Sequence, residues 1–339
     1  MIFITNFPSF YKINLYNQIA KKRKIKVIFL GKYSKYRNKN FIDLNFNFDF
    51  YFLTKKNYEL RKKIKSIFLL FYFLYKNKDK NVVLSGWNEI EYWLCLIFFN
   101  RKKFLILESN IHDSKKNFLK LVLKKFFLKF VNTVIASGNL QKKLLSILNF
   151  KKKIFISKGV GIINFNKKLI NKKICYKKNF LFIGRLESEK NIYPMLNFFI
   201  KNKNFNLTMI GQGSQELKVK KIIKGKRNII LIKNVNNYNL KKYFLDTSFL
   251  ILPSLIEPWG LVIEESLAFN VPVIVSKHCG VCSIIKNNIH GYIYNPNISE
   301  GLENIIKNIN QKNFKKLKQN ISKYPLQNNS SQINTFINL

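Results

Sequence analysis

Residues Ile256–Ser266 read IEPWGLVIEES, and they place three carboxylates close together in a chain that has few. The whole sequence holds 17 acidic residues among 339, against 61 Lys and Arg. Just before this stretch, Thr247–Ser254 is a short apolar run with branched side chains, which predicts a buried strand. Pro258 and Gly260 indicate a turn, and residues 261–269 then repeat with helical spacing. The stretch therefore predicts a strand, a turn and the start of a helix, in the order typical of an α/β fold.

The same turn has the chemistry to bind an anion between two carboxylates. The backbone amides of Gly260, Leu261 and Val262 open the predicted helix, and the free amides of a helix N-terminus attract anions. Glu257 precedes the helix, and Glu265 lies one to two turns inside it. A phosphate flanked by carboxylates that hold sugar hydroxyls describes a nucleotide-sugar site. The alternative is that glutamate simply suits the positive end of a helix.

The spacing of these two glutamates also resembles a known signature. Glu257 and Glu265, embedded in EPWGLVIEESLA, are similar to the motif of the retaining glycosyltransferases of family 4, with Trp259 where the family has Phe. The resemblance implies an α/β chain of GT-B architecture, with two Rossmann-like domains facing a central cleft.

The resemblance and the length of the chain together predict the domain boundaries. We expect residues 1–165 to form the acceptor-side domain and residues 166–310 the nucleotide-sugar domain, with a polar linker at Asn166–Lys178. Residues 311–339 should be a helical tail that packs back on the first domain, with a frayed segment at Asn328–Ser331.

A second motif follows the first predicted strand of the second domain. Asn179–Ile183 runs into GRLESEKN, which resembles a phosphate-binding loop of the family and begins at Gly184. Arg185 is one of only six arginines in a lysine-rich chain, and its rigid fork suits phosphate oxygens. The resemblance implies that Arg185 and Lys190 stabilise a departing diphosphate and that Val235 lies near the nucleotide base. The alternative for this loop is a solvated salt bridge.

The resemblance also assigns the carboxylates. Glu257 should hold hydroxyls of the transferred sugar and Glu265 the ribose hydroxyls, while Glu264 should point elsewhere and tolerate substitution. The chain contains no Asp-x-Asp, so we expect no metal and no cofactor.

The first domain is less well marked. We expect a strand at Met1–Phe7, a helix at Asn14–Lys24 and irregular structure over residues 33–60. His112 follows the predicted strand Phe104–Glu108, and the resemblance implies a histidine facing the transferred sugar in this loop. A solvated loop histidine fits the sequence equally well.

The formal net charge of +44 has two interpretations. One is a coding bias toward Lys, Asn, Ile and Phe. The other is attraction to polyanions, and the predicted helices Lys62–Lys76 and Lys115–Phe130 mix lysines with bulky apolar residues as a membrane-surface helix does. No nucleic-acid module is recognisable, so we expect an anionic membrane surface as a partner and no nucleic acid.

Two further features bear on compartment and metal binding. No basic leader precedes the apolar N-terminus, and the longest apolar run, Ile67–Tyr75, is short for a spanning helix, so we expect a cytoplasmic protein, peripheral on the inner face of the membrane. Four cysteines form no disulfide framework. Cys279 and Cys282 leave a metal or redox site open, but no second pair completes a zinc set, and a turn is the better interpretation.

The predicted function is transfer of a sugar, with retention, from a nucleotide-diphosphate sugar, preferably a UDP-sugar, to a glycan or lipid-linked acceptor in surface polysaccharide or lipopolysaccharide assembly. The alternatives are a GT-B epimerase or phosphorylase, or a non-catalytic module that binds membrane or nucleic acid. Turnover of the donor would separate an enzyme from a binding module.

Overall fold

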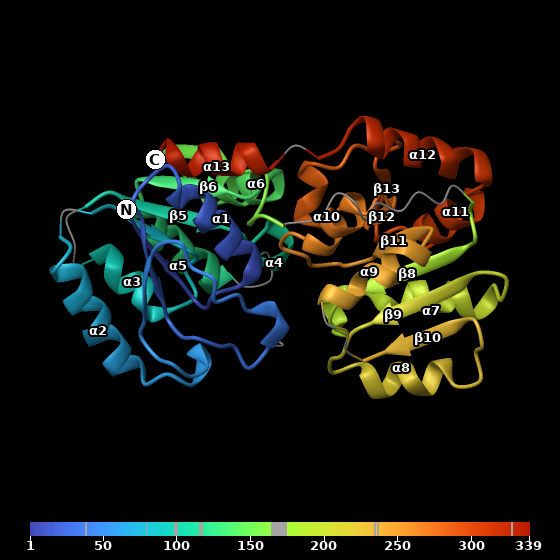
Figure 1. Cartoon of the computed structure of the whole chain (residues 1–339), viewed down its shortest axis with the longest axis horizontal. Coiled ribbons are helices and arrows are strands. Elements are labelled where there is room, and N and C mark those ends of the chain that lie inside the picture. The colour runs from blue at the N-terminus through green and yellow to red at the C-terminus, as the bar shows by residue number, and fades with distance from the viewer. Residues whose placement is uncertain are drawn as a thin grey trace. The chain divides into compact units, whose positions relative to one another are not determined.

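The protein has two compact units, each an α/β domain. The computed structural model describes residues 1–37, 39–78, 80–97, 101–114, 118–163, 175–233, 235, 237–326 and 328–339. The first unit comprises residues 1–164 with 327–339, and the second comprises residues 165–326. Each consists of a sheet with helices on its faces (Figure 1), which confirms the predicted class of two Rossmann-like domains.

Within the described residues the first unit contains a parallel sheet of seven strands in the order β3-β2-β1-β4-β5-β6-β7. Its strands are β1 Ile2–Thr5, β2 Lys26–Phe29, β3 Asp49–Phe52, β4 Val82–Leu84, β5 Lys103–Leu107, β6 Thr133–Ala136 and β7 Lys153–Ile156. Its helices are α1 Phe10–Ala20, α2 Lys63–Tyr75, α3 Ile90–Ile97, α4 Ile111–Ser114, α5 Phe118–Lys129, α6 Asn139–Ile147 and α13 Asn329–Ile337.

The second unit has a parallel sheet of six described strands, in the order β10-β9-β8-β11-β12-β13. Its strands are β8 Asn179–Ile183, β9 Asn206–Ile210, β10 Ile229–Ile232, β11 Phe249–Leu252, β12 Val273–Ser276 and β13 Gly291–Tyr294. Its helices are α7 Ile192–Lys201, α8 Glu216–Ile223, α9 Asn237–Asp246, α10 Leu261–Ala268, α11 Gly301–Asn308 and α12 Gln311–Lys323.

The strands are apolar on both sides because helices cover both faces of each sheet. In β1, Ile2 and Ile4 belong to the core on one face, whereas Phe3 belongs to the core on the other. This alternation follows from the two-residue period of a strand.

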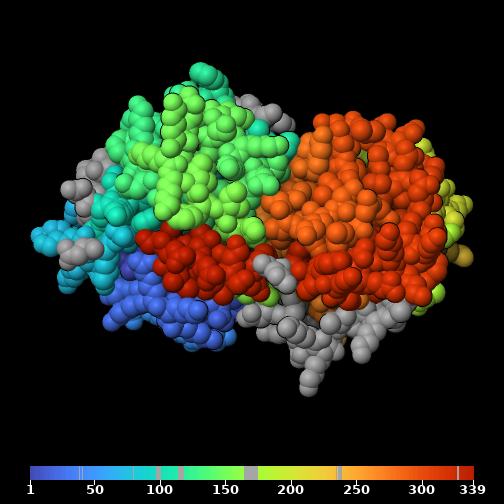
Figure 2. Space-filling view, turned by 90° about the horizontal axis from the view of Figure 1, so that it is seen from above, coloured from blue at the N-terminus to red at the C-terminus, as the bar shows by residue number. Residues whose placement is uncertain are grey.

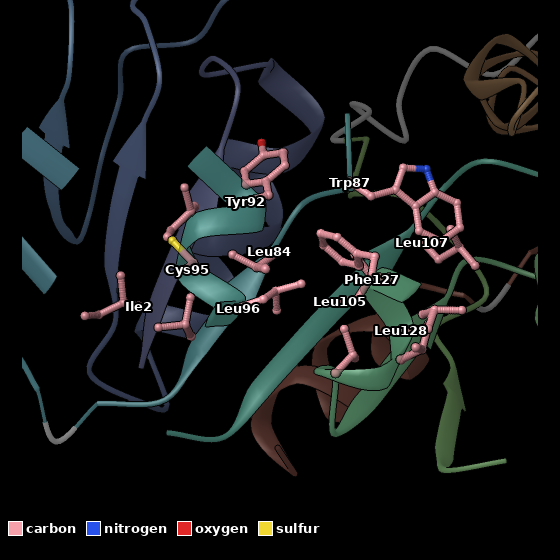
Figure 3. Close-up of a cluster of buried hydrophobic side chains, with 14 of the residues drawn as sticks. Ile2, Leu84, Trp87, Tyr92, Cys95, Leu96, Leu105, Leu107, Phe127 and Leu128 are labelled. Carbon is pink, nitrogen blue, oxygen red and sulfur yellow. The ribbon is translucent and has the colours of Figure 1, made fainter. Parts of the chain in front are cut away.

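Helices α2, α3 and α5 share one face of the first sheet. Leu70 of α2, Tyr92 of α3 and Phe127 of α5 are buried in the same cluster, and Figure 3 shows Phe127 beside Trp87, from the loop after β4. The two rings meet edge to face, with centroids 6.3 Å apart.

Helix α13 completes the opposite face of the first unit. Phe336 lies in the same buried cluster as Phe3, and the backbone N–H of Gly161 donates to Gln332 Oε1 at 2.8 Å. Figure 2 shows this C-terminal segment in red against the blue and green atoms of the first unit. A side chain at Gly161 would collide with the backbone of Tyr11, at 2.5 Å, so the chain passes closely here.

The tail differs from the prediction. Only residues 327–339 belong to the first unit, because Phe314 and Leu317 of α12 are buried in the core of the second. The segment expected to fray carries the first turn of α13. The predicted linker lies largely outside the described residues, at 164–174, as does the start of the predicted helix at 115–117.

Two other local predictions were wrong. Residues 33–60, expected to be irregular, contain the edge strand β3, and α1 begins at Phe10 rather than Asn14. Among the described helices none has the length and apolar character needed to cross a bilayer.

Candidate functional site

The motif residues of the second unit lie where the order of its sheet reverses. The chain runs from β8 to β9 and β10, and it then returns to β11, which pairs with β8 on the other side. Open parallel sheets bind ligands at the carboxyl ends of the strands at such a reversal. Gly184 and Arg185 directly follow β8, and the loop to Gly260 follows β11. The two motifs that were singled out in the sequence therefore meet.

An ion pair joins these two motifs. Lys190 Nζ donates to Glu257 Oε2, and the two side chains are only 11% and 13% exposed. The backbone N–H of Leu255 also donates to the carbonyl of Glu189 at 2.9 Å. Because the pair is largely withdrawn from solvent, salt screens it less than a surface pair. The positions of Lys190 and Glu257 are therefore coupled.

Arg185 stands at the more open side of the same loop. Its side chain is 49% exposed, and Nη2 lies 2.7 Å from Glu189 Oε1. A half-exposed guanidinium can turn its planar fork toward phosphate oxygens. Since Arg185 and Lys190 each contact a carboxylate, a bound diphosphate would share or replace these partners.

The next loop of the second unit closes against the Arg185 loop. Ser214 donates to Glu187 through its backbone N–H, at 3.0 Å, and through its hydroxyl, at 2.6 Å. A side chain at Gly211 would lie 1.8 Å from the carbonyl oxygen of Gly184. Gly211 and Gly213 are together only a weak sequence signal. The structure explains why glycine is needed in this loop, because two backbones approach closely here.

Gly260 shapes the start of α10. Its φ of +106° is in the left-handed region, and a side chain there would come within 2.9 Å of Leu252 Cδ2. The helix begins at Leu261, so the amides of Leu261 and Val262 lie in the first turn, where no intrahelical acceptor exists. These amides follow Glu257 by only a few residues, which places a partial positive charge beside the ion pair.

A short turn supports the loop that carries Glu257. The N–H of Gly280 donates to the carbonyl of Glu257 at 3.1 Å, and the N–H of Val281 donates to that of Trp259 at 3.0 Å. Cys279, beside this turn, is buried, and burial raises the pKa of its thiol. Burial likewise raises the pKa of Cys282 to about 12. Neither thiol is therefore readily ionised, and the turn has a structural role that agrees with the preferred interpretation of the sequence.

The two glutamates of α10 have different surroundings. Glu264 is buried and accepts a hydrogen bond from Trp259 Nε1 at 2.5 Å. Glu264 thus faces the indole of the motif, and this buried contact argues against the expectation that Glu264 tolerates substitution. Glu265 is partly buried. Burial and the charge of Glu264 together raise the pKa of Glu265 to about 7.

Two other predicted residues belong to different elements. Val235 follows β10, two strands away from β8 in the sheet. His112 belongs to the first unit, in the short helix α4, where Asn110 Oδ1 accepts from its backbone N–H at 2.9 Å. The residue directly after β5 is Glu108.

The sequence interpretation did not single out Glu108 or its partner. Glu108 Oε1 lies 2.8 Å from Lys12 Nζ. The available signal was the position of Glu108 at the end of a predicted strand, but its partner is remote in the sequence. Within the described ranges no group of three His, Cys, Asp or Glu side chains is placed to hold a metal ion.

Comparison with known proteins gives the second unit a family match. Residues 164–328 match the sequence model of the glycosyl transferases group 1 family. An uncharacterized glycosyltransferase of Haemophilus influenzae is 24% identical over 314 residues, which cover 87% of this chain and 85% of the relative. For the leading curated matches, however, the chain spans only 40% to 59% of the relative's length.

Solved structures show the same fold over the whole chain. The apo form of the lipopolysaccharide outer core galactosyltransferase WaaB has a TM-score of 0.69 and 14% identity, and the alignment covers 100% of both chains. The Anabaena protein HepE, in complex with UDP and glucose, has a TM-score of 0.73 and 12% identity, with 99% of this chain and 98% of that chain covered. The fold is thus that of GT-B glycosyltransferases.

Proposed function

We propose that this chain, whose second unit matches the glycosyl transferases group 1 family, is a retaining glycosyltransferase. It would take a sugar from a nucleotide-diphosphate donor, preferably a UDP-sugar, and pass it to a glycan or lipid-linked acceptor of a surface polysaccharide or lipopolysaccharide. The observation that carries the proposal is the cluster at the reversal of the second sheet, where Arg185, the Lys190–Glu257 pair and the start of α10 meet. The WaaB and HepE likenesses support the choice of acceptor class and of UDP.

In this proposal the cationic side chains of Arg185 and Lys190 act on the departing diphosphate. As the bond between the anomeric carbon and the phosphate oxygen breaks, the electron pair departs with the diphosphate. Arg185, Lys190 and the amides of Leu261 and Val262 stabilise the charge that develops on it, as preorganised donors do in other transfer reactions. No divalent cation is needed for this step.

The two glutamates would act on different parts of the donor. Glu257, coupled to Lys190, faces the transferred sugar, where cationic character builds at the anomeric carbon. Glu257→Gln should therefore lower kcat more than it raises KM, because interactions that strengthen in the transition state govern kcat. Glu265 holds the ribose and should act mainly on donor affinity. Glu300→Gln, on the surface, is the matched control.

A melting screen tests the donor class. UDP, GDP, ADP and TDP are added separately to the full chain, and a ligand at ~100 times its Kd adds about 2.7 kcal/mol of stability. We expect the largest rise in Tm with UDP, and a smaller rise in the Lys190→Met variant. If no nucleotide shifts the Tm, the proposed function is wrong. If only a purine nucleotide does, UDP is the wrong donor base.

The first unit carries two helix faces that suit a membrane surface. The exposed apolar side chains of α2 are Ile64, Phe68, Phe71, Tyr72 and Tyr75, and they line an open apolar hollow. Those of α5 are Phe118, Leu119, Val122, Leu123 and Phe126.

Exposed lysines flank these rings, including Lys63 and Lys65 on α2 and Lys125 on α5. Each lysine near an anionic bilayer contributes about 1 kcal/mol, and each buried ring about 1.5–3 kcal/mol. We propose that both faces dock on an anionic membrane surface, which would place the enzyme on the cytoplasmic side as a peripheral protein close to a lipid-linked acceptor.

Vesicle co-sedimentation tests the membrane partner. We expect binding to phosphatidylglycerol-containing vesicles at low salt, weaker binding at high salt, and little binding to phosphatidylcholine alone. Phe68→Ser and Phe118→Ser should each weaken binding, whereas Leu217→Ser, an exposed leucine on α8 of the second unit, should not. Equal binding of all three variants would exclude docking through α2 and α5.

A further inference from the structure

The loops that follow β11 and β12 lie side by side at the carboxyl edge of the second sheet. The two strands are parallel neighbours, with Leu252 of β11 opposite Val275 of β12. Beyond the strands, Glu257 and Cys279 form an isolated parallel bridge. Because neighbouring parallel strands end at the same edge of a sheet, residues that follow β12 are in position to hold the loop that carries Glu257.

His278 adds a side chain to this contact. The residue is only 8% exposed, and its ring Nδ1 lies 3.1 Å from the carbonyl oxygen of Leu255. A carbonyl oxygen only accepts hydrogen bonds, so Nδ1 carries the proton and donates. Burial lowers the pKa of His278, which keeps the ring neutral at neutral pH. The ring therefore holds the loop just before Glu257.

The backbone of Leu255 is held from both sides. Its N–H donates to the carbonyl of Glu189 at 2.9 Å, and its carbonyl accepts from the ring of His278. Glu189 directly precedes Lys190, whose ammonium group donates to Glu257. Without the ring, the carbonyl of Leu255 would turn to water. The loop would then lose a fixed point beside the Lys190–Glu257 pair.

A second buried histidine of this unit provides a comparison. His290 is 3% exposed, its Nδ1 accepts from the N–H of Lys286 at 3.0 Å, and its Nε2 lies 2.8 Å from the carbonyl of Tyr324. It directly precedes β13, at the amino end of that strand, whereas His278 follows the carboxyl end of β12. His290 therefore ties the end of α12 to the edge of the sheet opposite to Glu257, where it supports the fold alone.

We propose that His278 is a positioning residue for Glu257. It acts through the backbone of Leu255, whose carbonyl it fixes, and thereby sets the direction in which Glu257 and Lys190 face the donor. The backbone hydrogen bonds of the neighbouring turn do not depend on this side chain, so a substitution removes the hold of the ring alone. The effect on turnover rests on the proposed function, whereas the effect on the loop is independent of any substrate.

His278→Asn and His278→Leu form a matched pair of variants. The two replacements have nearly the same shape, but only the Asn amide nitrogen, which branches from Cγ as Nδ1 does, can donate to Leu255. Amide hydrogen exchange of residues 253–260 is measured on the full chain by mass spectrometry. Exchange should be faster than in the parent for the Leu variant and close to the parent for the Asn variant. Equal exchange in the two variants would overturn the proposal.

Donor turnover supplies a second readout. His278→Leu should lower kcat by about 10- to 100-fold, with a smaller change in KM, because a small misplacement of a catalytic group has an effect of that size. His278→Asn should restore most of the activity. His290→Leu should lower the Tm without lowering kcat, and Lys277→Met, at the exposed neighbour, should change neither. If His278→Leu also lowers the Tm alone, His278 is structural and the proposal is overturned.

The two readouts separate failure of this inference from failure of the proposed function. If the parent chain turns over no nucleotide sugar, the proposed function is wrong, and the exchange comparison decides whether His278 holds the loop. If the parent turns over a donor and both His278 variants have the same kcat, the positioning role is wrong and the proposed function stands.

Discussion

The two units build the same kind of sheet around a reversal in strand order, yet they hold their charges differently. In the second unit Arg185 is half exposed, and its carboxylate partner is four residues away. In the first unit Arg61 is buried, and its guanidinium donates to both oxygens of Glu91 at 2.7 Å and to Glu89 at 2.6 Å. Burial alone would raise the pKa of Glu91, but Arg61 lowers it below its usual value.

The difference indicates that Arg185 is available to bind a ligand, whereas Arg61 stabilises the fold. Arg61 follows the edge strand β3, whereas Glu89 and Glu91 lie at the start of α3, so the pair anchors the edge of the sheet to its centre. A buried pair is costly to break, because the remaining charge is left without a partner. Arg185, by contrast, can exchange one carboxylate for another anion at little cost.

The largest effect should come from Arg61→Met. It leaves Glu91 buried and unpaired, which should lower the free energy of unfolding by about 3–5 kcal/mol and the Tm with it. The matched control is Arg227→Met, at an exposed arginine of the second unit. Adding Glu91→Gln to Arg61→Met should recover part of the loss. A Tm equal to that of the parent would mean that the buried pair contributes nothing to the fold.

Lys190→Met tests whether the charges of the second unit act on a ligand. It removes one donor from the leaving group, so kcat should fall by about 10²- to 10³-fold. Lys201→Met, at the exposed end of α7, should leave kcat unchanged. The measurement is donor turnover by the full chain. A loss of stability without a loss of kcat would assign Lys190 to the fold, like Arg61.

Glu265 should make donor affinity depend on pH. Its pKa of about 7 in the free chain means that the carboxyl is mostly protonated below pH 7 and is then a poorer acceptor for ribose hydroxyls. Affinity for UDP-glucose, measured by calorimetry, should rise from pH 6 to 8, with a limiting slope of about tenfold per unit below the pKa. Because the folded pKa is raised, the same group stabilises the unliganded fold at low pH and loses that contribution as the pH rises through 7.

Glu265→Gln is the control for that profile. It should flatten the pH dependence and weaken UDP-glucose binding by roughly ten- to a hundredfold, since a charged hydrogen bond contributes about 1.5–3 kcal/mol. A variant that kept the same slope would assign the pH dependence to another group.

The smallest expected effect is that of EDTA. If cationic side chains and amides alone stabilise the leaving group, donor turnover should be unchanged after chelation. Turnover that disappears with EDTA and returns with manganese or magnesium would contradict the account of Arg185 and Lys190.

The sequence was sufficient to predict most of the strands and the two motif loops that meet in the second unit. Buried strands such as β11 are continuous apolar runs, and residues 184–190 and 257–265 are contiguous motifs, so their placement follows from local pattern. β3 was missed because it is an edge strand whose Phe50 and Tyr51 are exposed, so its aromatic residues do not mark a buried face.

The ion pair of Lys12 and Glu108 could not be predicted because residues far apart in the sequence form it. Lys12 and Glu108 meet only when β1, β4 and β5 are aligned, and neither residue carries a local signal of its partner. The contact of Glu264 could not be predicted for a related reason. Its hydrogen bond to Trp259 depends on how the turn at Gly260 folds back on the helix.

Helix α13 makes the order of synthesis matter to the first unit. Phe336 and Gln332 fill its core and cap its Gly161 loop, so the N-terminal unit cannot complete its packing until residues 328–339 have left the ribosome. At about 5–20 residues per second, translation of the intervening second unit delays that moment by roughly ten to thirty seconds. During this interval the face around Phe3 lacks its cover from α13, and transiently exposed apolar surface of this kind is prone to aggregate.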